Sequence, residues 1–166
     1  VQGVLHTDDG LKYADGNPFG EATFCGESAL RLNSRLYLLP KLKSRFVFGS
    51  SIPAIYQNYA GGVADGYYLP WQMSWESVQH VHLLECNVVT AQLGFRYRVK
   101  GKFYLTALGE YGKEAYKFSH ILIGDDLWGG ALRASYDFVL GPVSIQTNYS
   151  NLGKNVGFYI NAGFVF

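Results

Sequence analysis

Apolar and polar residues alternate along most of this chain, and this alternation limits the fold more than any other feature. Successive side chains of a β-strand point to opposite faces, so a period of two separates the two faces of a sheet. From position 143 the odd residues are Val143, Ile145, Thr147 and Tyr149, whereas the even residues are serine, glutamine and asparagine. The pattern predicts a strand with one apolar and one polar face.

Further segments show the same period. Their apolar positions are Leu30, Leu32, Leu36 and Leu38; Phe46, Phe48 and Ile52; Ala91, Leu93, Phe95, Tyr97 and Val99; Phe103, Leu105, Ala107, Gly109 and Tyr111; Trp128, Gly130, Leu132, Ala134, Tyr136, Phe138 and Leu140; and Phe158, Ile160, Ala162, Phe164 and Phe166. Arginine recurs on the opposite faces, at Arg31, Arg35, Arg45, Arg96, Arg98 and Arg133. We therefore expect an all-β fold of antiparallel strands.

Two architectures use such strands: a soluble sandwich or barrel with an apolar core, and a transmembrane barrel whose apolar face meets lipid. Charged residues make up only 16% of the chain, against about 25% in ordinary soluble domains. Aromatic residues stand at expected strand ends, at Tyr97, Tyr111, Trp128 and Tyr149, where a membrane-interface girdle would place them. The expected strand lengths also match the roughly 9–11 residues that cross a bilayer at a tilt. We therefore expect a transmembrane β-barrel, with a soluble β-sandwich as the alternative.

Composition narrows the functional classes. The chain has 14 Lys and Arg residues against 13 Asp and Glu residues, which leaves no basic surface of the kind that binds nucleic acid. No run of apolar residues approaches the ~18 that a membrane-spanning helix needs. Any secretory signal has been removed or lay upstream of Val1.

The lengths of the connections predict the topology. Short turns are expected at Leu39–Lys43, Val99–Lys102 and Leu140–Pro142, and long connections at Lys113–Leu127 and Tyr56–Asn87. Outer-membrane barrels have short periplasmic turns and long outer loops. We therefore expect residues 1–28 to form an outer loop with a possible first strand. Residues 29–166 should form barrel strands, interrupted by one long outer loop at 57–87 that contains no spanning strand.

The order of the last segments resembles the carboxyl-terminal barrel of the BamA/TamA superfamily of outer-membrane assembly and secretion proteins, in particular the barrels fused to patatin-like phospholipases. The resemblance covers about residues 29–166 and rests on "NVVTAQLGFRYRV", on Leu108, Glu110 and Gly112, on "VLGP", and on a final strand that ends in Phe. In the loop "NYAGGVADGYYLP" the matching positions are Tyr59, Gly61, Gly62, Asp65, Gly66 and Tyr67.

Two positions depart from the family pattern. Asp65 stands where the loop motif has Arg, and Glu110 stands where the strand motif has Asp, so the family's Arg-to-Asp contact cannot form between them. An unpaired carboxylate in a confined interior is costly. We therefore expect Glu110 to pair with an arginine on the same face: Arg96, Arg98 or Arg133.

The resemblance implies a sixteen-stranded barrel, whereas this chain supplies seven clear strands, with residues 1–20 as a candidate for an eighth. It is therefore interpreted as the carboxyl half of a longer barrel. The alternatives are half of a two-chain barrel and a closed eight-stranded barrel. The stripe Phe158, Ile160, Ala162, Phe164 and Phe166 is interpreted as an insertion signal read by the barrel assembly machinery. The expected partners are this machinery, the lipid of the bacterial outer membrane and the remaining strands.

The resemblance predicts an anchoring, export or assembly role for an attached domain, such as a patatin-like lipase outside this chain. The alternative is a self-contained barrel that binds a ligand or acts as a rim hydrolase through Asp8, Asp9, Asp125 and Asp126 with His6, His80, His82 and His120. No recognisable catalytic motif is present, so we expect no enzyme activity, no cofactor and no metal site in this chain. Cys25 and Cys86 could form a disulfide in an oxidising compartment.

Overall fold

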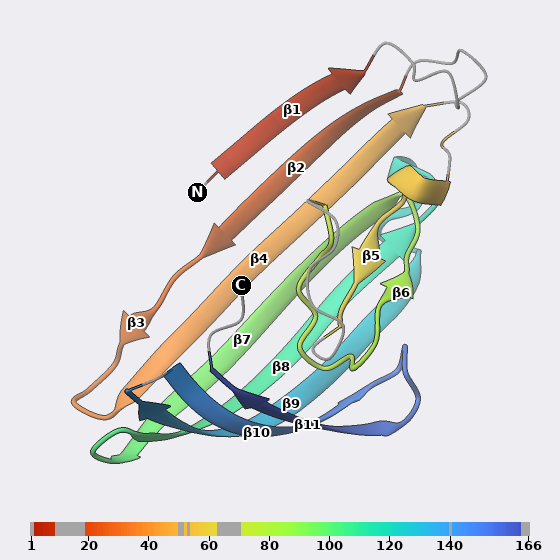
Figure 1. Ribbon diagram of the computed structural model, residues 1–166. Helices are drawn as coiled ribbons and strands as arrows, with labels where there is room; N and C mark the ends of the chain where they lie inside the picture. Colours follow the sequence, from red (N-terminus) through yellow and green to blue (C-terminus); the bar gives the residue numbers. More distant parts are fainter. Residues whose placement is uncertain are drawn as a thin grey trace.

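The computed structural model describes residues 2–8 as backbone, and residues 19–49, 52, 54–62, 71–139 and 141–163 in full. Eight strands form one antiparallel sheet in chain order, as Figure 1 shows. They are β1 (Gln2–Asp8), β2 (Phe19–Glu27), β4 (Leu36–Gly49), β7 (Asn87–Lys100), β8 (Phe103–Ala115), β9 (Asp125–Phe138), β10 (Gly141–Ser150) and β11 (Val156–Ala162). The short strand β3 (Leu30–Arg31) follows β2 and also pairs with β4. The all-β antiparallel fold expected from the alternation is therefore confirmed.

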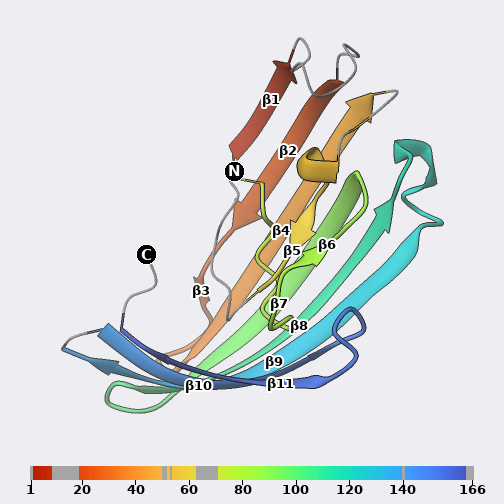
Figure 2. The same ribbon diagram turned by 45° about the vertical axis from the view of Figure 1, so that its right-hand side comes forward.

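The sheet is curved and open. Strands β1 and β11 lie at its two edges, and in the described part of the chain they do not pair with each other. The sheet curves around a loop that joins β4 to β7, and this loop carries β5 (Tyr59–Ala60) and β6 (His82–Leu83) (Figure 2). We call the sheet face that carries this loop the inner face and the opposite one the outer face. Over the described ranges, no helix has the length and apolar character needed to cross a membrane.

The two faces differ in the way that the sequence predicts. Outer positions of β7 to β11 are large and exposed: Leu93, Phe95, Tyr97, Leu105, Tyr111, Trp128, Leu132, Tyr136, Phe138, Val143, Ile145, Tyr149, Phe158 and Ile160. Inner positions include buried polar residues: Thr90, Thr106, Glu110, Ser135, Gln146, Asn148 and Ser150. The sheet is thus apolar outside and polar inside, the reverse of a soluble domain.

The apolar clusters of the described residues are small and lie between the loop and the inner face. One cluster joins Met73, Trp75 and Val78 of the loop to Val88 and Leu127 of the sheet. A second cluster joins Phe19, Val47 and Cys86 at the end of the sheet where β4 leads into the loop. These clusters hold the loop against the sheet.

The short turn expected at Leu39–Lys43 is wrong, because β4 runs through these residues without interruption. Pro40 pairs with Leu93 of β7, while its carbonyl accepts a hydrogen bond from Ser28 N at 3.1 Å. In an antiparallel ladder the N–H and C=O of one residue point to the same neighbour, so the missing N–H of Pro40 faces the break between β2 and β3. A proline is tolerated there because the ladder is already interrupted.

The expected boundaries at the start of the chain also need correction. Residues 1–28 contain two strands of the sheet, β1 and β2, instead of an outer loop with at most one strand. The connection expected at Lys113–Leu127 is shorter, because β8 extends to Ala115 and β9 begins at Asp125. In β8 and β9 the error concerns only the ends of the strands.

Candidate functional site

The loop between β4 and β7 covers the inner face of the sheet. Its described parts are residues 52, 54–62 and 71–86, which contain the 3-10 helix η1 (Ala54–Tyr56) and the two-residue strands β5 and β6. Within these parts β5 and β6 are each two residues long. The loop folds back along the sheet, so it is a plug over the inner face (Figure 2).

Glu110 of β8 holds the tip of this plug. Its two carboxylate oxygens accept hydrogen bonds from the backbone N–H groups of Glu76 and Ser77, each at 2.8 Å. Glu110 is only 5% exposed, and each of its two oxygens has an amide donor. A buried carboxylate is stabilised when its oxygens accept such bonds.

Strands β9 and β10 hold the same tip from the other side. Arg133 forms an ion pair with the Glu76 carboxylate, and its Nε donates to Gln146 Oε1 at 2.8 Å. Gln146 Nε2 and Asn148 Nδ2 both donate to the Glu76 carbonyl, at 2.7 and 3.1 Å. Three adjacent strands therefore bind Glu76 through its side chain, its amide and its carbonyl.

The interior arginines do not pair with Glu110, which corrects the expectation from the sequence. Arg133 reaches Glu110 only indirectly, through Glu76. Arg98 donates from Nη2 to the Ser34 carbonyl at 2.7 Å, and the Arg96 guanidinium lies 4.7 Å from the centre of the Tyr104 ring. The carboxylate is satisfied by backbone amides, so it needs no arginine.

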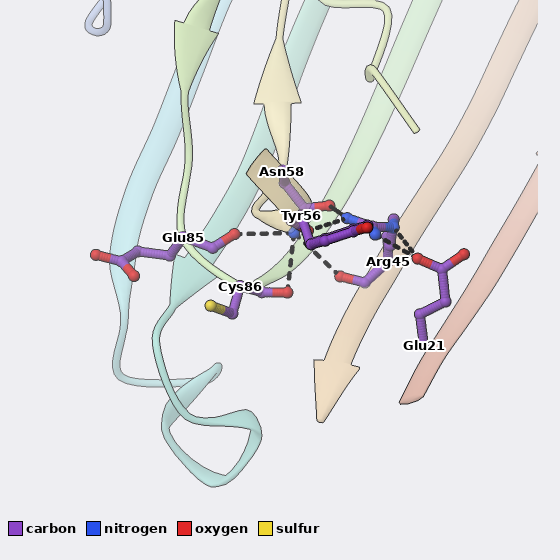
Figure 3. Close-up of polar contacts among 6 residues, drawn as sticks. All are labelled: Glu21, Arg45, Tyr56, Asn58, Glu85 and Cys86. Atoms are coloured by element: carbon purple, nitrogen blue, oxygen red, sulfur yellow. Dashed lines mark hydrogen bonds and ion pairs between the residues drawn. The ribbon is translucent and has the colours of Figure 1, made fainter. Parts of the chain in front are cut away.

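A second anchor, drawn in Figure 3, lies near the end of the sheet where β4 enters the loop. Arg45 of β4 is fully buried and pairs with Glu21 of β2, with Nε 2.9 Å from Oε2. Its Nη1 donates to the Tyr56 carbonyl at 2.9 Å and to Asn58 Oδ1 at 3.1 Å. The Trp71 ring centre lies 5.5 Å from the guanidinium carbon.

Asn58 links this anchor to the other end of the loop by hydrogen bonds. Its Nδ2 donates to the carbonyls of Glu85 and Cys86, at 2.8 and 2.9 Å (Figure 3). Arg45 thus binds residues that leave β4, and Asn58 binds residues that approach β7. Together they close the base of the plug.

Both cysteines are free thiols in the structure. Cys25 lies opposite Lys43 of β4, whereas the Cys86 carbonyl bonds to Val47 N, four residues further along the same strand. That offset is about 13 Å at ~3.3 Å per residue, well beyond the ~7 Å that a disulfide can span between Cα atoms. The structure therefore gives no support to the Cys25–Cys86 disulfide. Burial raises the pKa of the Cys86 thiol, and the nearby Glu85 charge adds to the effect.

Two glycine sites allow the plug to approach its neighbours. A Cβ at Gly129 of β9 would lie 2.1 Å from Ser77 Oγ, so any side chain there would displace the tip. At Gly62 a Cβ would lie 2.6 Å from the His80 carbonyl carbon. Of the expected loop motif, Tyr59 donates from its hydroxyl to the Ala54 carbonyl at 3.1 Å, and Gly61 follows β5. Asp65, Gly66 and Tyr67 lie outside the described residues.

The remaining site residues from the sequence fall in two groups. Phe158, Ile160 and Ala162 share the exposed outer face of β11, while Phe164 and Phe166 lie outside the described residues. Of the rim hydrolase candidates, Asp126 accepts a hydrogen bond from the Tyr111 hydroxyl at 2.6 Å and pairs with Lys113. Across the described ranges, no group of three or more His, Cys, Asp or Glu residues could hold a metal ion.

Sequence reasoning missed the centre of this site. Glu76 and Ser77 have no distinctive sequence pattern, because their backbone groups make most of the contacts. Gln146 and Asn148 had a usable signal, since both lie on the polar face of a strongly alternating strand. Arg45 was on a predicted polar face, but its partners Glu21 and Asn58 lie in segments without clear alternation.

A scan of known protein families found no matching family model, and a search of curated proteins found no match. The geometry of the sheet and the plug, with the resemblance described above, is therefore the basis for a proposal of function.

Proposed function

We propose that this chain is a segment of a transmembrane β-barrel in the bacterial outer membrane. One observation carries the proposal: the outer face of the sheet is apolar and exposed while the inner face is polar and covered. Leu132 in the middle of β9 is 61% exposed, whereas Ser135 on the inner face of the same strand is 3% exposed. Lipid is the solvent in which such an outer face is stable.

Aromatic residues on the outer face support this orientation. Tyr111, Trp128 and Tyr149 lie together on β8, β9 and β10, and the last two rings have centres 5.7 Å apart. Phe103 and its neighbour Tyr136 lie at the other end of the same strands. Tyr111 lies eight residue steps after Phe103, which is about 26 Å of strand, or about 20 Å of height at a tilt of ~40°. That height is close to the ~25 Å apolar band between the aromatic girdles of outer-membrane barrels.

The open sheet supports a barrel completed by further strands, from the same chain or from a second one. Unpaired N–H and C=O groups along the edges of β1 and β11 would each cost several kcal/mol in hydrocarbon. With the resemblance to the BamA/TamA superfamily, this favours the carboxyl part of a larger barrel. The barrel would anchor an attached domain, such as a patatin-like lipase outside this chain, or help to export or assemble it, after insertion by the barrel assembly machinery.

Membrane fractionation and heat modifiability of the intact protein test the proposal. We expect the protein in the outer-membrane fraction, extracted only with detergent. On a gel without boiling it should migrate faster than after boiling, because a folded barrel resists unfolding in detergent. A protein that is monodisperse in plain buffer would contradict the proposal. A heat-modifiable product consisting only of these residues would instead favour a closed eight-stranded barrel.

A further inference from the structure

A cavity of about 330 Å³ lies between the tip of the plug and the inner face of the sheet. Its floor comes from two neighbouring rows of inner-face residues, which the strand register brings together. One row contains Arg96, Arg133 and Gln146, and the next contains Ser135, Ser144 and Asn161. Gly61, Gly62, Ser74, Trp75 and Glu76 form the roof.

Hydrogen-bond donors without partners gather around this cavity. Four residues that line it each have a buried polar atom with no hydrogen-bond partner: Ser74 Oγ, Trp75 Nε1, Arg96 Nε and Ser135 Oγ. Ser135 is 3% exposed and Trp75 is 2% exposed, so bulk water does not reach these groups freely. An arginine Nε and an indole Nε1 can only donate, and the two hydroxyls can donate as well.

The charges on the cavity wall are not balanced. Arg133 is paired with Glu76, but Arg96 has only the Tyr104 ring as a partner, and no carboxylate among the described residues pairs with it. The residues that line the cavity therefore carry one excess positive charge, and four of them hold unpartnered donors that have almost no accessible surface in the ligand-free protein. A molecule that only accepts hydrogen bonds and carries negative charge complements both properties.

We propose that this cavity binds a small oxyanion, with Arg96 supplying the charge and Ser135, Ser74 and Trp75 supplying further donors. The proposal goes beyond the anchoring role and does not depend on the attached domain. Water alone could occupy the donors, but it would leave the Arg96 charge unbalanced. The oxyanion could be a free ion or the phosphate of a lipid headgroup, and the test separates these two sources.

The test is isothermal titration of the intact protein in detergent at constant ionic strength, first with inorganic phosphate and then with a short-chain phosphatidic acid. Arg96→Gln should weaken binding at least about tenfold, because a charge-assisted hydrogen bond to the anion is lost. Ser135→Ala should also weaken binding. Without the anion it should leave the unfolding temperature unchanged or raise it, because the removed hydroxyl has no partner in the ligand-free protein.

Arg98→Gln is the matched control. Arg98 is the next inner-face arginine on β7, but it bonds to the Ser34 carbonyl and does not line the cavity. Arg98→Gln should change the affinity less than about twofold, because Arg98 makes no hydrogen bond to the anion and a partly exposed charge without such a bond contributes little. Binding of either probe that depends on Arg96 and Ser135 supports the site and identifies the source of the anion. The proposal is overturned if neither probe binds, or if Arg98→Gln weakens binding as much as Arg96→Gln.

Discussion

Glu110 is the residue on which the position of the plug most depends. Substitution Glu110→Ala would leave the amides of Glu76 and Ser77 without their acceptor, and each such bond to a charged group contributes about 1.5–3 kcal/mol. We expect the tip to detach and the loop to become sensitive to protease, while the strands remain folded. Limited proteolysis with mass spectrometry of the fragments measures this.

Glu27→Ala is the control for this substitution. Glu27 pairs with Lys41 through a side chain that is 70% exposed, and exposed pairs contribute little. Cleavage in the loop should therefore stay at the wild-type rate. Equal protection of the loop in Glu110→Ala and in the wild type would show that the Glu110 contacts do not hold the plug.

The two thiols should differ in reactivity. Because burial raises the pKa of Cys86, less of it is thiolate at pH 8 than for an ordinary thiol, and the thiolate is the reactive form. We expect maleimide to label the partly exposed Cys25 first, and Cys86 to react appreciably only at higher pH or after unfolding. Mass spectrometry of labelled peptides from pH 7 to pH 10 measures both rates. Labelling of Cys86 as fast as Cys25 at pH 8 would contradict the buried position of Cys86.

The close approach of β9 to the plug can be tested by adding a side chain at Gly129. Gly129→Ala would place a Cβ 2.1 Å from Ser77 Oγ and 2.8 Å from the Tyr149 carbonyl. We expect a loss of about 1–3 kcal/mol, the usual cost of overpacking, and exposure of the tip to protease. Gly109→Ala is the matched control, because its Cβ would meet nothing within 4 Å. The temperature at which half of the protein shows the mobility of the unfolded form should fall for Gly129→Ala and stay unchanged for Gly109→Ala.

Strand positions were predictable where the alternation is strict, as in β7, β8, β9 and β10. In these strands apolar side chains occupy one face and polar side chains the other, so the sequence shows which face each residue occupies. The prediction was wrong at β4, because the lysines and Pro40 in Leu39–Lys43 are residues typical of a turn. The contacts of Glu110 were beyond prediction for another reason: their donors are backbone amides, which every residue has.

The orientation of the sheet determines which of its side chains would meet lipid. Leu132 lies on the outer face in the middle of β9. Val156, the first residue of β11, lies on the same face, opposite Tyr149 of β10. In a bilayer, Leu132→Arg should cost about 2–4 kcal/mol, because it buries a charge near the midplane. Val156→Arg should cost about 0–1 kcal/mol, because the interface can solvate the arginine.

Each variant is folded into vesicles and unfolded with urea. The folded fraction at each urea concentration is read from the gel mobility without boiling, and the urea midpoints are compared. A large loss for Leu132→Arg and a small one for Val156→Arg would place the outer face in hydrocarbon with the aromatic ends at the interface. In water the same substitutions should both be nearly neutral, since each replaces an exposed apolar side chain. Equal, small effects in vesicles would therefore contradict the lipid-facing orientation, whatever the protein is attached to.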